Sequence, residues 1–345
     1  MDLEELVERI NEAAAAARPL RLQGSGSRSR DLPPGPDTVL DLSGLRGVVD
    51  HEPRELVVSV RAATPLAELQ ATLAEAGQTL ATDPARPAGR GTVGGALAAG
   101  EHGPARPWAG TLADAVLGLE LINGRGEHLR LGGRVIKNVA GYDLSRLQAG
   151  AWGVFGPVVL LHLRVDPLPE RTLTRAFPLP LEAALERMTH WQHRPLPLRG
   201  LAWVDGVLRV RLAGSAAGVA EAAAELGGDD PGETTFWDDL RDRRLPFFTN
   251  GGPLWRLSLP PAAPQPDLPG AWLIDWGGAL RWYRGPAPAE AVRAAARRLG
   301  GWARPWGMPH NPFDDLPANP LAVTRQLKRA FDPYGLFNPH LLGTD

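Results

Sequence analysis

Three glycine-rich segments in the first half of the chain constrain the fold more than any other feature. They cover residues 24–26, 91–103 and 141–156. The side chains of such segments are too small to build a hydrophobic core, so their backbones must approach a ligand or another part of the molecule closely. The stretch from Pro84 to Gly110 is also too long and too poorly periodic for an ordinary connection, which indicates a functional loop.

The first cluster, Gly24-Ser25-Gly26-Ser27-Arg28, follows a predicted strand. Its backbone N–H groups and serine hydroxyls suit the oxygens of a diphosphate. A nicotinamide dinucleotide fingerprint is excluded because Ser29 stands where glycine or alanine is needed, and no Gly-Lys-Ser/Thr sequence of a Walker loop occurs. Taken alone, the cluster is also typical of a plain loop.

Composition limits the classes of function. The 345 residues, 43% of them hydrophobic, suffice for two or three lobes with separate cores. A formal charge of -2 gives no indication of the excess positive charge that binds nucleic acid or an anionic membrane. Because cysteine is absent, disulfides and cysteine-ligated iron–sulfur clusters are excluded, and a redox cofactor has to be organic. The acidic N-terminus and the lack of a long apolar run predict a cytoplasmic protein without direct membrane insertion.

Sequence patterns predict helices and short strands in alternation up to about residue 168. An amphipathic helix is expected over 2–17, and a second helix runs from Thr64 to Gly77 with Pro65 at its first position. Residues 123–126, Asn-Gly-Arg-Gly, predict a hairpin. The expected strands cover 20–22, 38–42, 56–62, 116–122, 128–131 and 158–165.

From about Leu173 a hairpin followed by a helix occurs twice, which indicates a separate domain. The two copies cover 201–228 and 271–301, and in each the helix ends at a pair of glycines. Together with further strands over 172–177 and 254–259 and a helix over 181–191, they predict an antiparallel sheet with helices on one face. Another helix is expected over 321–330.

Four motifs occur in a specific order. They are Gly24-Ser25-Gly26-Ser27, Thr92-Val93-Gly94-Gly95, residues 137–143 (Lys-Asn-Val-Ala-Gly-Tyr-Asp) and residues 331–339 (Phe-Asp-Pro-Tyr-Gly-Leu-Phe-Asn-Pro). Together they resemble the vanillyl-alcohol-oxidase-type FAD-binding family and, within it, the E subunits of bacterial glycolate oxidase. The resemblance extends over about residues 20–168 and 321–341.

The resemblance implies an α+β fold. A PCMH-type FAD-binding domain of two α/β subdomains would occupy residues 1–168. An antiparallel-sheet cap domain with helices on one face would follow over 169–312, and a C-terminal segment, 313–345, would return to the FAD-binding domain.

The resemblance also implies which residues contact FAD. Residues 24–28 would surround the pyrophosphate, 92–95 and Gly103 would border the dinucleotide, 137–142 would approach the flavin, and Asn338 would reach it from the C-terminus. Covalent members of the family carry a histidine in the first loop; this loop has none, so FAD is expected to be bound non-covalently. The full predicted set is Gly24, Ser25, Gly26, Ser27, Arg28, Thr92, Val93, Gly94, Gly95, Gly103, Lys137, Asn138, Gly141, Tyr142, Gly150, Gly153 and Asn338.

Lys137 is of interest apart from any resemblance. The chain has 35 arginines and two lysines, Lys137 and Lys328, and Lys137 lies inside a candidate cofactor segment. A compact ammonium there could stabilise the negative charge that a flavin gains on reduction. The alternative is a surface lysine without such a role.

No catalytic residue can be nominated. Catalytic subunits of related 2-hydroxy-acid dehydrogenases carry a His-x-Gly-Asp-Gly-Asn-x-His motif in the cap, whereas the nearest segment here, Asp275-Trp276-Gly277-Gly278, has no histidine and reads as a turn. His190 and His193, with Glu186, form one possible metal-binding helix face. A solvated helix end explains them as well, and no metal is expected.

Nine of the eleven tryptophans fall between Trp191 and Trp306. Tryptophan is enriched at protein interfaces. Trp203 and Trp272 lie on predicted strands and are expected in a core. Trp302 and Trp306 lie in a stretch rich in glycine and proline and are candidates for docking a partner.

An intact flavin domain beside a cap without catalytic histidines favours an accessory FAD-binding subunit of a glycolate oxidase complex. By resemblance, its partners are a catalytic flavoprotein subunit that oxidises glycolate to glyoxylate and an iron–sulfur subunit that passes electrons toward the respiratory chain. Those partners would be its only route to the inner membrane. One alternative is a free-standing FAD-dependent oxidoreductase for a hydroxy acid or sugar alcohol, and another is a structural subunit that has lost FAD.

Overall fold

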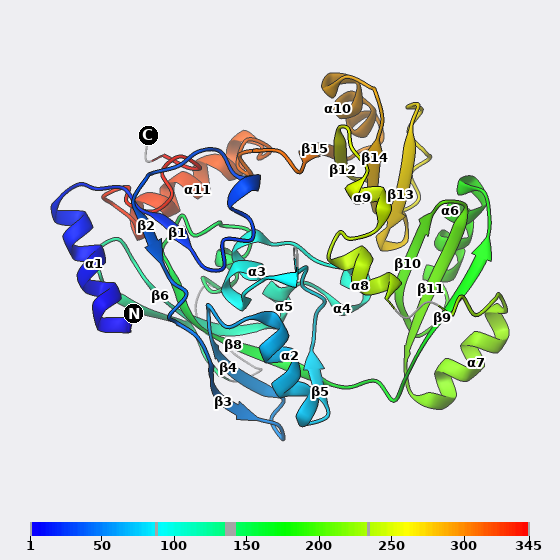
Figure 1. The fold of residues 1–345 in the computed structure, drawn as a ribbon, viewed down its shortest axis with the longest axis horizontal. Helices are drawn as coiled ribbons and strands as arrows, with labels where there is room; N and C mark the ends of the chain where they lie inside the picture. The colour runs from blue at the N-terminus through cyan, green and yellow to red at the C-terminus, as the bar shows by residue number, and fades with distance from the viewer. Residues whose placement is uncertain (1, 87–88, 135–142, 233–234, 344–345) are drawn as a thin grey trace. The chain divides into compact units, whose positions relative to one another are not determined.

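The computed structural model describes residues 2–86, 89–134, 143–232 and 235–343. Contacts divide the chain into two compact units (Figure 1). The first comprises residues 1–102, 111–168 and 309–345, and the second comprises 103–110 and 169–308. Residues 103–110, which the sequence placed in the FAD-binding domain, therefore belong to the second unit, and the return of the chain begins at Pro309.

The first unit contains helices at both ends of its sequence and most of its strands between them. Its elements are α1 (Leu3–Ala15), β1 (Arg21–Gln23), η1 (Ser29–Asp31), β2 (Val39–Asp41), β3 (Val48–Glu52), β4 (Val57–Arg61), α2 (Leu66–Glu75), β5 (Gln78–Leu80), α3 (Val93–Ala99), α5 (Leu112–Ala115), β6 (Val116–Ile122), β7 (His128–Gly132), η3 (Arg146–Gln148), β8 (Val158–Pro167) and α11 (Ala318–Phe331).

Two sheets organise this unit. An antiparallel sheet has the order β3-β4-β8-β6-β7, and β5 pairs with β8 beside it. Its core joins Leu69 of α2, Leu97 of α3 and Leu161 of β8. A separate pair, β1 and β2, is parallel and shares a second core with α1, to which Leu6 and Ile10 contribute. These are the two α/β subdomains that the sequence predicted.

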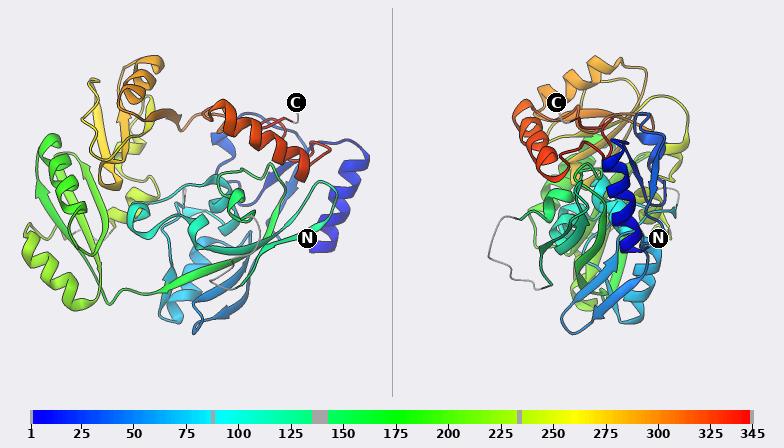
Figure 2. Two further views of the ribbon diagram at one scale, coloured as in Figure 1. Left: turned by 180° about the vertical axis from the view of Figure 1, so that it is seen from behind. Right: turned by 90° about the vertical axis from the view of Figure 1, so that its left-hand side faces the viewer.

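The C-terminal segment returns to the first strands of the same unit. The backbone N–H of Leu20 donates to the carbonyl of Leu336 at 2.7 Å, and that of Asn338 donates to the carbonyl of Leu20 at 2.9 Å. From either side, the red segment lies beside the blue strands (Figure 2). Residues from opposite ends of the sequence therefore form one surface.

The second unit is built on one long antiparallel sheet with the order β15-β12-β14-β13-β10-β11-β9. Its elements are α4 (Arg106–Ala109), β9 (Arg171–Pro178), α6 (Leu181–Gln192), β10 (Leu198–Val204), β11 (Val207–Gly214), α7 (Ala216–Leu226), α8 (Phe236–Arg241), α9 (Pro246–Thr249), β12 (Leu254–Ser258), β13 (Ala271–Asp275), η4 (Trp276–Gly278), β14 (Leu280–Arg284), α10 (Ala289–Arg298) and β15 (Trp302–Trp306).

Helices cover both faces of this sheet, not one face as the sequence predicted. The three long helices, α6, α7 and α10, pack on one face, where Met188 and Val292 are fully buried. The short helices α8 and α9 pack on the other, where they bury Trp237 and Phe247. The reason is that strands such as β13 carry apolar side chains on both faces, so each face needs a cover.

Two further segments differ from expectation. The stretch 84–110 is not an unbroken loop, because Thr92 caps α3 and the short α4 follows. Trp302 and Trp306, in the stretch rich in glycine and proline, form the ends of a strand that the sequence did not predict, β15, which pairs with β12 at the edge of the sheet. Across the described residues, no helix is long and apolar enough to cross a membrane.

Candidate functional site

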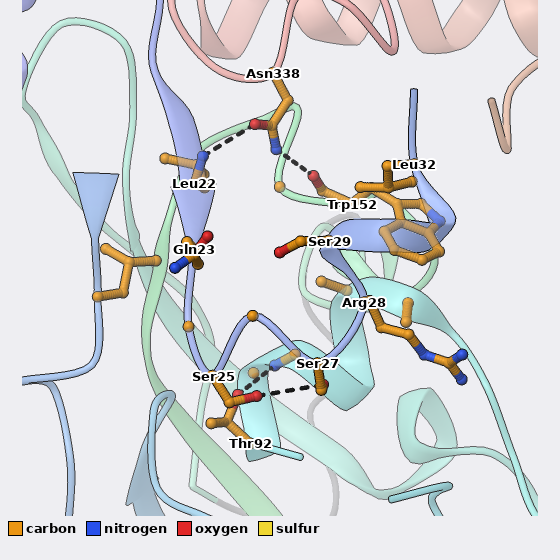
Figure 3. Close-up of a pocket in the computed structure, with 18 of the residues that line it drawn as sticks. Leu22, Gln23, Ser25, Ser27, Arg28, Ser29, Leu32, Thr92, Trp152 and Asn338 are labelled. Carbon is orange, nitrogen blue, oxygen red and sulfur yellow. Dashed lines mark hydrogen bonds between the residues drawn. The ribbon is translucent and has the colours of Figure 1, made fainter. Parts of the chain in front are cut away.

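A cavity of about 440 Å³ lies within the first unit, between the first glycine cluster, α3 and the C-terminal segment (Figure 3). Its volume is in the range of small-molecule sites. Ten residues of the predicted set line it, from four distant parts of the chain. They are Gly24, Ser25, Gly26, Ser27, Arg28, Thr92, Gly94, Gly95, Gly153 and Asn338.

The first loop forms one wall. Gly26 has a φ of +68°, a left-handed conformation that turns the chain after β1 and that other residues rarely adopt. The hydroxyl of Ser25 donates to that of Ser27 at 3.3 Å. Arg28 is held by an ion pair of 2.9 Å with Asp31 and by a second one with Glu101. One hydrogen bond within the loop and the two ion pairs of Arg28 therefore fix its conformation without a ligand.

The loop before α3 and the first residues of that helix form the floor. The hydroxyl of Thr92 accepts a hydrogen bond from the N–H of Gly95 at 3.1 Å, which caps the helix. A Cβ on Gly94 would lie 2.7 Å from the Cβ of Ala62, and one on Gly24 would lie 3.3 Å from the hydroxyl of Thr92. These glycines thus serve close packing within the wall as well as the open space of the cavity.

Asn338 joins two walls of the cavity. Its Oδ1 accepts from the N–H of Leu22 at 3.0 Å, across 316 residues of sequence, and its Nδ2 donates to the carbonyl of Trp152 at 2.7 Å. Figure 3 shows it between these two residues, opposite Ser25 and Thr92. Asn338 itself has a φ of +46°, which asparagine tolerates better than most residues. Its side chain sets the distance between β1 and the loop around Gly153.

Polar groups without protein partners also line the cavity. The side chain of Gln148 is 2% exposed, and neither its amide oxygen nor its amide nitrogen has a hydrogen-bond partner among the described residues. Both ring nitrogens of His340 are likewise buried and without a described partner. Buried polar atoms are nearly always hydrogen-bonded, so these groups point to a ligand that completes them.

The charges of the cavity favour an anion. Three arginines, Arg21, Arg28 and Arg30, line it together with one acidic residue, Glu101. Burial lowers the pKa of His340, and the nearby charge of Arg21 lowers it further. A positively charged wall next to backbone N–H groups and serine hydroxyls suits a diphosphate.

Gln148, His340, Arg21 and Arg30 also line the cavity, and the sequence analysis did not predict them as site residues. Gln148 lies just before Gly150, and a polar residue next to a glycine-rich segment could have indicated a site residue. His340 carried no signal, because it approaches the cavity only when the C-terminal segment folds back. Its ring packs on Gly35, where a Cβ would lie 2.5 Å from Cε1 of the ring.

Three predicted residues lie elsewhere. Val93 is fully buried in the core of the first unit. Gly150 does not line the cavity, and its N–H donates to the carbonyl of Leu97 at 2.9 Å. Gly103 belongs to the second unit, where its carbonyl accepts from the indole N–H of Trp276 at 2.9 Å. Four further predicted residues, Lys137, Asn138, Gly141 and Tyr142, lie outside the described residues.

The histidines of the second unit show no metal site. Nowhere in the ranges that the structure describes do three His, Asp or Glu side chains group as metal ligands would. The Nδ1–H of His193 donates instead to the carbonyl of Thr189 at 2.7 Å.

Comparison with known proteins also indicates FAD binding. Residues 1–132 match the family described as FAD binding domain. A solved structure of alkyldihydroxyacetonephosphate synthase superposes with a TM-score of 0.69 at 16% identity, covering 97% of this chain and 74% of that one. Fold and site together define an FAD-binding protein of the PCMH type.

The sequence comparison is more specific. The chain is 42% identical over 334 residues to glycolate oxidase subunit GlcE of Escherichia coli strain K12, which covers 97% of this chain and 95% of the relative. Glycolate oxidase subunit GlcD of Bacillus subtilis is 37% identical over 83 residues, 24% of this chain and 18% of that protein. The chain belongs to the family of the glycolate oxidase subunit GlcE.

Proposed function

We propose that this chain is the FAD-binding accessory subunit of a glycolate oxidase complex and supports the oxidation of glycolate to glyoxylate. Its partners are a catalytic flavoprotein subunit and an iron–sulfur subunit, which carries electrons to a respiratory acceptor. The chain is cytoplasmic and reaches the inner membrane only through these partners. The end-to-end similarity to GlcE carries the proposal.

The cavity residues fit non-covalent FAD. Residues 24–28, with Arg21 and Arg30, would hold the pyrophosphate through backbone N–H groups, hydroxyls and charge. Gln148 would complete its amide hydrogen bonds on the dinucleotide. Bound FAD would supply the capacity to accept and pass on two electrons. Lys137 and Tyr142 remain predicted flavin neighbours.

The second unit supports an accessory role. Its only histidines in the sequence, His190 and His193, lie at the end of α6 beside Gln192, whose Nε2 donates to the carbonyl of Gly277 in the Trp276 turn at 2.9 Å, and the turn itself has no histidine. That turn is the short helix η4, held by a hydrogen bond of 2.7 Å from the N–H of Trp276 to Asp275. It therefore supplies no imidazole to take a proton from a substrate hydroxyl.

The test uses the purified chain and the complex. The chain alone is expected to show flavin absorbance, to release FAD on acid precipitation, and to leave glycolate unoxidised in the presence of a dye. Coexpressed partner subunits are expected to co-purify and to oxidise glycolate. Glycolate oxidation by the chain alone would show a free-standing enzyme instead, and absence of flavin after reconstitution with FAD would show a structural subunit.

A further inference from the structure

Arginine and tryptophan side chains alternate along one region of the second unit. Successive members of this arginine–tryptophan ladder are separated by 4.5–5.9 Å between a guanidinium carbon and a ring centroid. The order is Arg106, Trp276, Arg256, Trp302, Arg304, Trp306, Arg243 and Trp282. Four positive charges are thus brought together, each against an aromatic face.

Arg256 is the centre of the ladder. Its guanidinium lies 5.2 Å from the ring of Trp276 and 5.3 Å from that of Trp302. Among the described residues its guanidinium makes no hydrogen bond and no ion pair. It also lies directly opposite Arg304 in the antiparallel pairing of β12 and β15. Like charges in directly opposed positions destabilise a sheet unless something compensates them.

The surroundings of Arg256 are unfavourable to an isolated cation. Burial lowers the pKa of Arg256 well below its usual value, and the charges of Arg304 and Arg243 lower it further. The charge of Asp275, at the end of β13, raises the pKa of Arg256 and so partly offsets this decrease. A bound anion would reverse the balance at Arg256, because its guanidinium would then face a negative charge.

Part of the ladder is accessible to solvent. Trp302 is 42% exposed, and Arg256 and Arg304 are both partly exposed. Guanidinium groups bind carboxylates through paired, planar hydrogen bonds, and the rings of Trp276 and Trp302 flank the guanidinium of Arg256.

We propose that Arg256 and Arg304, flanked by Trp276 and Trp302, form a binding site for a small carboxylate anion, of the size of a two-carbon hydroxy or oxo acid. Only the choice of glycolate as the first probe rests on the proposed function. The site needs neither FAD nor partner subunits, so the full chain alone can be tested.

Tryptophan fluorescence of the full chain reports on the site, since indole rings flank Arg256. Glycolate and oxalate are expected to change the fluorescence saturably at constant ionic strength, whereas glycolamide, a neutral analogue of glycolate, is not. Arg256→Gln is expected to weaken binding at least about tenfold. Arg298→Gln, an exposed arginine on α10, serves as the matched control and should leave binding unchanged.

Arg304→Gln tests the same site from the neighbouring strand if Arg256→Gln fails to fold. Equal binding of glycolate to wild type and to both variants, or equal binding of glycolamide, would overturn the proposal. Loss of partner co-purification in Arg256→Gln without any carboxylate binding in wild type would overturn it too, in favour of an acidic residue of a partner. Flavin content is measured in parallel and reports separately on the proposed function.

Discussion

The ammonium of Lys328 lies 2.5 Å from the carboxylate of Asp332, and both side chains are fully buried. The ammonium also donates to the carbonyls of Val154 at 2.8 Å and Phe337 at 2.6 Å. The carboxylate accepts from the N–H groups of Leu336 and Phe337. This pair fastens the C-terminal segment next to Asn338, so it supports the wall of the cavity without lining it.

Replacement of Lys328 by Met is expected to lower the free energy of unfolding by about 3–5 kcal/mol, because Asp332 is left buried without its cation. The affinity for FAD should fall as well, since Asn338 loses its support. Urea unfolding and FAD titration measure the two effects. Arg325→Met, an exposed position on the same helix, is the control. A loss below about 1 kcal/mol, typical of a surface ion pair, would contradict the prediction.

Gln148→Leu should separate stability from cofactor binding. Removing a buried amide that has no partner among the described residues should leave the protein without FAD as stable as before, or more stable by about 1 kcal/mol. The affinity for FAD should fall about tenfold or more, because the ligand loses hydrogen bonds from a buried amide.

Gln78→Leu is the control for Gln148→Leu, because it should reduce stability without changing the affinity for FAD. Gln78 is also buried, but its amide nitrogen donates to the carbonyl of Pro53 at 2.7 Å and its oxygen lies 2.8 Å from a ring nitrogen of His51. Its replacement should cost about 1–3 kcal/mol of stability and leave FAD affinity unchanged. Similar FAD affinities for both variants would show that Gln148 does not contact the cofactor.

Asn338→Gly should loosen the cavity without straining the backbone, since glycine tolerates the φ of +46°. Two hydrogen bonds are lost, which together contribute about 2 kcal/mol. FAD titration is expected to show about tenfold weaker binding, corresponding to about 1.4 kcal/mol. Binding within twofold of wild type would mean that the link between Leu22 and Trp152 is dispensable.

The stability of the protein without FAD should decrease at mildly acidic pH because of His340. Burial lowers its pKa in the folded protein, whereas the unfolded chain binds a proton near 6.5. As the pH falls from 6.5 toward the lowered pKa, the unfolded state binds more protons and the free energy of unfolding decreases. His162 has a pKa lowered in the same direction by its own burial, so both contribute.

Comparison with His340→Gln isolates the contribution of His340. Unfolding of wild type and variant is followed in urea at a series of pH values below 7. The decrease in stability should be smaller in the variant, because the contribution of His340 is removed while that of His162 stays. Parallel curves would show that His340 is freely protonated in the folded state.

Local patterns determined much of this protein. The strand and helix periods, the Asn123 turn and the paired glycines after α7 and α10 are read from neighbours in sequence. The ordered motifs likewise predicted the FAD-binding fold, which the comparisons confirm. They also predicted that the segments beginning at Gly24 and Thr92 belong to one site, and both line the same cavity.

Only the tertiary structure decided which side chains complete the site. Gln148 and His340 reach the cavity because distant segments fold back on β1. That their polar atoms have no hydrogen-bond partner among the described residues is known only from the tertiary structure. Lys328 shows the same limit: its buried ammonium has three hydrogen-bond acceptors, and sequence composition could not predict them. Hydrogen-bond satisfaction and burial depend on contacts across hundreds of residues, and no local pattern encodes them.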